Sequence, residues 1–156
     1  MNNSELKKLV NNIVGLKLNW IRCTCEMLRF HFGQYAFHVQ CLTRIIKNDD
    51  ILVTTLDYQS WDGEDSEHND EWYNLEKFKN IIDGGKVLRV EVTPWNDVFI
   101  EMDNDIKIQF LIQNSYAHYD EESEQYRFFE APDEETEEEE TLRKHCVVYN
   151  KHIELE

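Results

Sequence analysis

The sequence predicts an α+β fold built from two halves, each a helix followed by an antiparallel β-meander. Three observations lead to this prediction. Apolar residues first recur with helical spacing and then alternate with polar residues, as in half-buried strands. Turn-forming residues separate the alternating stretches at short intervals. The same succession then appears twice, over about residues 4–56 and again over about residues 70–130.

Each half opens on a predicted amphipathic helix, at residues 4–14 and 70–82. In both helices, apolar residues recur every three or four positions and form one stripe that packing can bury. The stripes consist of Leu6, Leu9, Val10 and Ile13, and of Trp72, Leu75, Phe78 and Ile82. Side chains able to cap the two helix starts are Asn3 or Ser4 and Asn69 or Asp70. Glycines that fit the two helix ends are Gly15 and Gly84.

Strands are predicted where apolar and polar residues alternate, because this pattern buries one face. Such stretches lie at residues 16–20, 28–32, 37–41, 51–56, 88–92, 98–102 and 106–110. A shift of about seventy positions places Leu18 on Leu88 and Leu28 on Val98. Few identical residues accompany this match, so two unrelated α+β stretches with similar turns remain the alternative. The two sheets can either merge or face each other.

Length and composition indicate a single domain covering residues 1–156. The chain has 41% hydrophobic residues, enough for a core. The N-terminus lacks the apolar stretch of a secretory signal, and no apolar run approaches the roughly 20 residues that cross a bilayer. We therefore expect a cytoplasmic protein without membrane contact, whose four cysteines are reduced.

Acidic residues dominate the charge, and two stretches contain most of them. Sixteen basic residues face 32 acidic ones, which gives a net charge of −16. Residues 57–71 carry −7 and residues 120–140 carry −11, so the rest of the chain is close to neutral at +2. We interpret both stretches as acidic loops. This charge repels phosphate backbones and anionic lipids, which disfavours direct nucleic-acid or membrane binding and favours a basic protein partner.

Aromatic residues interleave with these carboxylates. The combination suits a surface that binds Arg and Lys side chains, because aromatics supply burial and charges supply steering. The predicted partner-binding residues are Asp57, Tyr58, Trp61, Asp62, Glu64, Asp65, Glu67, Asp70, Glu122 and Glu124. The alternative is that the acidic runs, such as Asp133–Glu140, are only solvated and that the aromatics belong to the core.

The cysteines and histidines offer few ligand sets. Cys23 and Cys25 are closely spaced, but a structural zinc site needs four ligands, and Cys41 and Cys146 stand alone. We therefore predict no metal and no cofactor, and we interpret the cysteines as small, semi-buried hydrophobic residues.

Two histidines flank a predicted hairpin. His31 opposes His38 if Gly33–Ala36 is a four-residue loop. Such a pair can hold a metal or sense pH, or it can be an ordinary solvent-facing pair. The corresponding place in the second half pairs Glu101 with Lys107.

Motifs that carry catalysis are missing from the sequence. We find no P-loop, dinucleotide fingerprint, G-x-S-x-G elbow or H-E-x-x-H pair. We assign no catalytic residue, and the absence of motifs lowers the expectation of an enzyme without eliminating it.

The second half carries a resemblance. Gly85–Val92 reads as a strand after a glycine, Asn96–Val98 stands where a "G-D-L" hairpin is expected, and Glu124–Phe129 matches a closing "E-x-W-R" strand with Tyr126 in place of Trp. These features resemble a group of small uncharacterised bacterial proteins that are similar to toxin-immunity partners. The resemblance covers mainly residues 80–130, and it implies an inhibitory binding function; it says nothing about catalytic residues.

Charge and resemblance together favour one function over three others. The leading hypothesis is an immunity protein that neutralises a basic bacterial toxin or nuclease by covering its cationic cleft. A DNA mimic or anti-defence inhibitor of a nucleic-acid enzyme is the first alternative, and it requires rigid rows of acids. A small enzyme without a recognisable motif and an assembly subunit, a homodimer included, are the others.

Overall fold

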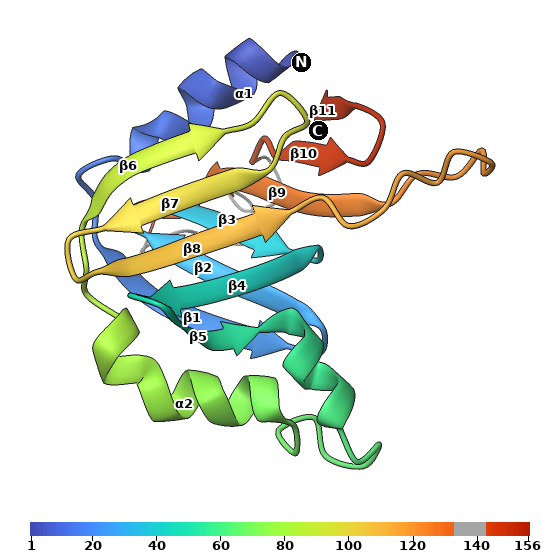
Figure 1. The fold of residues 1–156 in the computed structure, drawn as a ribbon. Coiled ribbons are helices and arrows are strands. Elements are labelled where there is room, and N and C mark those ends of the chain that lie inside the picture. The colour runs from blue at the N-terminus through green and yellow to red at the C-terminus, as the bar shows by residue number, and fades with distance from the viewer. Residues whose placement is uncertain (133–142) are drawn as a thin grey trace.

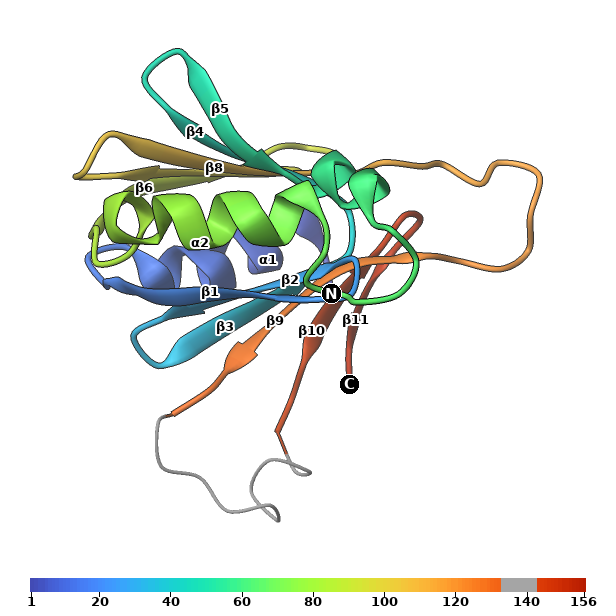
Figure 2. The same cartoon turned by 90° about the horizontal axis from the view of Figure 1, so that it is seen from below.

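Two antiparallel sheets face each other in a computed structural model that describes residues 1–132 and 143–156 (Figures 1 and 2). The first sheet has the order β1 (Leu18–Thr24), β2 (Met27–Phe32), β3 (Tyr35–Val39), β9 (Glu124–Glu130), β10 (Cys146–Tyr149) and β11 (Ile153–Leu155). The second has the order β5 (Asp50–Thr54), β4 (Leu42–Lys47), β8 (Ile106–Leu111), β7 (Val98–Met102) and β6 (Val87–Val92). Strands take up 42% of the described residues and helices 21%, which confirms the predicted α+β class and its excess of strand.

Helices close the space between the sheets at two opposite sides (Figure 1). Helix α1 (Asn3–Val10) and the 3₁₀ turn η1 (Asn11–Ile13) pack against β6. Helix α2 (Asp70–Ile82) packs against β1 and β5, and Figure 2 shows it along the opening between the two layers. A second 3₁₀ helix, η2 (Thr55–Ser60), joins β5 to the segment before α2. None of the helices in the described ranges is long and apolar enough to cross a membrane.

The helix starts follow local capping chemistry. Asn69 caps α2 by accepting a hydrogen bond from the Trp72 backbone N–H, as predicted. Helix α1 starts earlier than predicted, because Asn2 and Glu5 form a reciprocal capping box that satisfies two backbone N–H groups.

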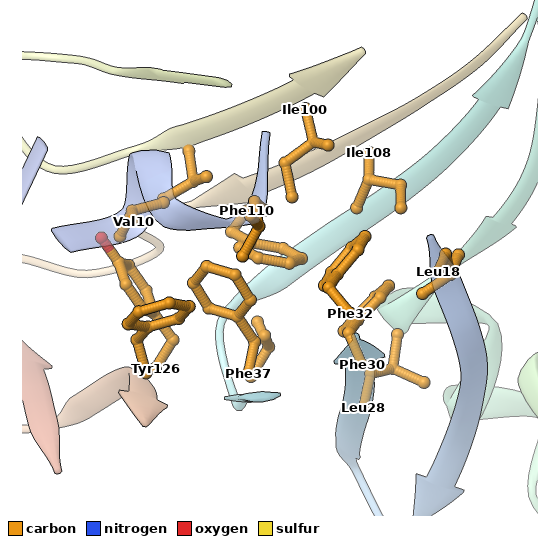
Figure 3. Close-up of a cluster of buried hydrophobic side chains, with 14 of the residues drawn as sticks. Val10, Leu18, Leu28, Phe30, Phe32, Phe37, Ile100, Ile108, Phe110 and Tyr126 are labelled. Carbon is orange, nitrogen blue, oxygen red and sulfur yellow. The ribbon is translucent and has the colours of Figure 1, made fainter. Parts of the chain in front are cut away.

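Aromatic side chains from both sheets form one core (Figure 3). The ring centroid of Phe110 on β8 lies 5.0 Å from that of Phe30 and 5.2 Å from that of Phe37. Phe30 and Phe37 come from the opposite sheet. Tyr126 is fully buried, and its hydroxyl donates to the Asn96 carbonyl oxygen at 2.8 Å. Most of the alternating apolar residues thus lie on the inner faces of the strands, as the sequence predicts. Trp20 and Leu88 are exceptions: the register shifts between Leu18 and Trp20 in β1 and between Val87 and Arg89 in β6, so Trp20 lies on the outer face with His31, and Leu88 is 61% exposed.

The predicted repeat of two self-contained halves is not supported. The two helices differ in length, with 8 residues in α1 and 13 in α2. Strand β4 leaves the first meander and pairs with β8, whereas β9 pairs with β3. The chain changes sheets after β3, where the N–H groups of Gln40 and Cys41 both donate to the Gln125 carbonyl oxygen. Alternation specifies which face of a strand is buried, but it does not specify the neighbouring strand.

The predicted opposition of His31 and His38 is wrong. Phe32 pairs with Tyr35, so the hairpin has a two-residue turn at Gly33 and Gln34, and His31 faces Ala36. Gly33 has a φ of 57°, which a glycine at the first position of a tight hairpin adopts without strain. The predicted register of Glu101 with Lys107 is confirmed.

Candidate functional site

The first acidic stretch is a loop only in its middle. It starts in η2 and ends in the first turn of α2, so the predicted acidic loop 57–71 shortens to residues 61–69. Asp57 belongs to η2, where its carboxylate accepts hydrogen bonds from the Thr54 N–H at 3.2 Å and the Asn74 side chain at 3.3 Å. Asp57 therefore holds η2 in place against α2.

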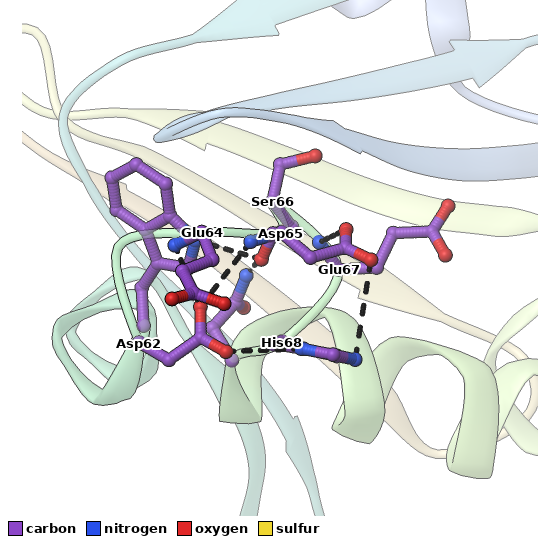
Figure 4. Close-up of polar contacts among 8 residues, drawn as sticks. Asp62, Glu64, Asp65, Ser66, Glu67 and His68 are labelled. Atoms are coloured by element: carbon purple, nitrogen blue, oxygen red, sulfur yellow. Dashed lines mark hydrogen bonds and ion pairs between the residues drawn. The ribbon is translucent and has the colours of Figure 1, made fainter.

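Carboxylates of the loop hold its backbone in shape (Figure 4). Asp62 accepts from the Glu64 N–H at 2.9 Å, and its other oxygen lies 3.0 Å from Nδ1 of His68. Asp65 accepts from the Glu67 N–H at 3.0 Å. The backbone hydrogen bond from Glu64, together with His68, lowers the pKa of Asp62. These hydrogen bonds favour the ionised form of Asp62 and hold the loop in a fixed arrangement.

Two exposed aromatic rings border the loop. Trp61 is 40% exposed, packs on the buried ring of Tyr58, and donates its indole N–H to the Asp65 carbonyl oxygen at 2.7 Å. Tyr73, on α2, is 58% exposed. We define the acidic surface as Trp61, Asp62, Glu64, Asp65, Glu67, Asp70 and Tyr73. Sequence reasoning left Tyr73 out of the predicted site, although its position outside the apolar stripe of α2 indicates exposure.

A shallow pocket of about 300 Å³ lies within the acidic surface. Its lining includes Glu67, His68, Asp70, Trp72 and Tyr73. Carboxylates beside aromatic rings suit a guanidinium or ammonium group, because charge and cation–π attraction act together there.

The acidic surface lacks a counter-charge from any arginine or lysine that the structure describes. Within residues 1–132 and 143–156, no Lys or Arg forms an ion pair with its carboxylates, and only His68 lies close to two of them. Uncompensated charge on an ordered loop attracts a cationic partner over a distance of about one Debye length, 8–10 Å.

The second acidic stretch contributes differently from the prediction. Residues Glu124–Glu130 form β9 and are no loop, because their alternating side chains pack in the sheet; the run at 133–140 lies outside the described residues. Glu122 pairs with His152. Glu124 binds the guanidinium of Arg127 with both oxygens, at 2.7 and 2.5 Å. Both carboxylates therefore already have partners within the protein, His152 and Arg127.

Tyr58 and Glu124, which are far apart in the sequence, come together in space. Both line an open pocket of about 490 Å³ beside the β1–β2 turn. Tyr58 is buried and supports Trp61. Of the predicted partner-binding residues, those of the acidic surface therefore form the exposed site, and Tyr58 lies beneath it.

A buried carboxyl adjoins the acidic surface. Glu71 is fully buried in the first turn of α2, and the Cys23 thiol donates to its Oε1 at 2.7 Å. Its Oε2 has no hydrogen-bond partner in the part of the chain that is described. Burial raises the pKa of Glu71 to about 7, and the nearby Asp57 and Glu26 add to the rise. Burial and Glu71 also raise the pKa of Cys23, so Cys23 is a neutral donor and a poor nucleophile.

We expect chelators to leave stability unchanged. Across the described ranges, no three His, Cys, Asp or Glu side chains are placed to hold a metal ion. The melting temperature of the purified protein should therefore be equal with and without EDTA. Stoichiometric zinc whose removal lowers the melting temperature contradicts this prediction.

Comparisons with protein-family models, with curated proteins and with solved structures give no match. The function is therefore inferred from the residues of this chain alone.

Proposed function

We propose that this protein is an inhibitory binding protein, an immunity protein that neutralises a basic bacterial toxin or nuclease through its acidic surface. One observation carries the proposal. Five carboxylates stand on one ordered segment beside Trp61 and Tyr73, without a Lys or Arg counter-ion among the described residues.

The acidic surface supports binding in two ways. Its charges accelerate encounter with a cationic cleft, because electrostatic attraction guides the partner before contact. Its aromatic rings then exclude water from the contact and strengthen each charge pair. The internal hydrogen bonds of Asp62 and Asp65 order the loop before binding, which reduces the conformational entropy lost on association.

A basic side chain from the partner fits the pocket beside Tyr73. There it meets the carboxylates of Glu67 and Asp70 and the rings of Trp72 and Tyr73. Arginine suits this site better than lysine, because its planar guanidinium stacks on rings and forms paired hydrogen bonds with carboxylates.

An oligoarginine peptide tests whether this surface recognises cationic side chains. In ¹⁵N-resolved NMR titrations, the indole N–H of Trp61 and the backbone N–H groups of residues 62–70 should shift first. An oligoglutamine peptide of equal length is the control and should shift none of them. Shifts that spread over all acidic positions, or that avoid residues 61–73, contradict the proposed site.

A further inference from the structure

The outer face of the six-stranded sheet carries a row of basic side chains. Successive cross-strand partners on β1, β2, β3 and β9 are Arg22, Arg29, His38 and Arg127. The residues that alternate with them, such as Phe30 and Phe37, fill the core, so the row faces outward. Arg143 lies on the same face, 5.1 Å from the Phe129 ring centroid. Four of the six arginines of a chain with net charge −16 thus lie on one face.

Arg22 and Arg29 form a like-charge pair on the arginine-rich face. They stand directly opposite each other on β1 and β2, an arrangement that destabilises a sheet. Neither forms an ion pair with any residue that the structure describes. The Nε of Arg29 is buried and finds no hydrogen-bond acceptor there. Arg127, in contrast, is neutralised by Glu124.

Stacked rings hold Arg22 in position. Its guanidinium carbon lies 4.4 Å from the centre of the Trp20 ring, and that ring stacks on His31 at 5.0 Å. His31 is fixed in turn by the Ala131 carbonyl oxygen, 2.8 Å from its Nε2. An arginine ordered in this way loses little side-chain entropy when it binds an anion.

The neighbouring His38 adds no positive charge to this pair. His38 lies next to Arg29 and Arg127, and its pKa is lowered to about 4 by burial first and by these two cations second. His38 is therefore neutral at physiological pH. The pair thus presents two full positive charges, which a bound anion neutralises.

We propose that this arginine face, defined by Arg22 and Arg29 with Trp20 beside them, binds an acidic segment of a partner protein. A carboxylate that bridges the two guanidinium groups supplies the missing counter-charge, with the paired geometry that arginine favours. A nucleic acid fits less well, because single strands bind by stacking bases on free aromatic faces. On this face, Trp20 already stacks on His31, and Phe129 on His145 at 4.3 Å.

The test is titration of the intact protein with a short polyglutamate peptide at low and at physiological salt. Replacing both arginines, as Arg22→Gln with Arg29→Gln, should weaken binding by roughly tenfold per arginine. The matched control is Arg44→Gln with Arg89→Gln, two arginines of the other sheet, which changes the net charge equally. Equal melting temperatures of the two double variants exclude unfolding as the cause.

Each outcome decides the proposal. Selective loss in the Arg22/Arg29 variant, together with shifts of the Arg29 Nε–H resonance in the wild type, supports it. Equal binding by both double variants overturns it, and so does the absence of binding at low salt. Oligothymidylate that binds more tightly than polyglutamate, with the same dependence on Arg22 and Arg29, also overturns it in favour of a nucleic-acid ligand.

Discussion

Replacing Glu71 with Gln should stabilise the protein at pH 8 by about 2–3 kcal/mol and should remove much of its pH dependence between pH 4.5 and 7. The side chain is fully buried and accepts a hydrogen bond from the Cys23 thiol. At pH 8 its charge has no cationic partner among the described residues. Glutamine keeps the size and an oxygen acceptor for the thiol, and it removes the charge.

The sign of the pH dependence follows from the raised pKa. The carboxyl titrates near its ordinary value of 4.5 in the unfolded chain and near 7 in the folded protein. Between these values the folded state binds more protons, so stability falls as pH rises through this window. Below about pH 4.5 both states are protonated, and the side chain no longer makes stability depend on pH.

Urea denaturation at pH 5 and pH 8 measures this effect. Wild type should lose stability between the two values by clearly more than the Glu71→Gln variant. The control is Glu76→Gln, an exposed carboxyl of the same helix, which should follow wild type. If the Glu71→Gln variant shows the same pH dependence as wild type, Glu71 is ionised without penalty and its buried placement is wrong.

The Trp61→Ala substitution should accelerate dissociation from the cationic partner, at a cost of about 2 kcal/mol in binding free energy. Trp61 is half-exposed in the free protein and stands among carboxylates, which is the setting of an aromatic anchor. The partner for this measurement is the basic toxin or nuclease of the proposed function, and a neighbouring gene that encodes such a protein would identify it.

Trp95 provides the matched control. It is 66% exposed in the β6–β7 turn, and its indole N–H is hydrogen-bonded to Asp97, much as that of Trp61 is bonded to Asp65. Surface-binding kinetics should show faster dissociation for Trp61→Ala and unchanged rates for Trp95→Ala. If the two substitutions have equal effects, Trp61 is not part of the interface. If the Trp61→Ala variant unfolds, the ring belongs to the core.

The local part of this fold could be predicted from the sequence, and the long-range part could not. Alternation predicted the inward-facing Phe30 and Phe37, and residue type predicted the helix cap at Asn69. Strand faces and helix caps depend on residues close by in the sequence. The pairing of β4 with β8 depends on residues far apart in the chain. The tight turn at Gly33 could have been recognised from its glycine.

The same division holds for the candidate sites. Charge and aromatic content located Trp61 and its acidic neighbours, because the loop is continuous in sequence. In the sequence, nothing distinguishes Glu71 from the other acidic residues. Only the packing of α2 against β1 buries it beside Cys23. The opposition of Arg22 and Arg29 arises from the register of β1 and β2, which composition does not specify.

The association rate constant with the basic partner, measured at low and at physiological salt, tests the central claim most directly. The variant combines Glu64→Gln, Glu67→Gln and Asp70→Asn, whose side chains make no hydrogen bonds within the described residues, so the loop stays ordered. The control combines Asp49→Asn, Glu91→Gln and Asp105→Asn, which removes the same charge from the β4–β5 turn, β6 and the β7–β8 turn. The account predicts slower, less salt-dependent association for the variant and wild-type association for the control. Equal association rates for all three proteins contradict it.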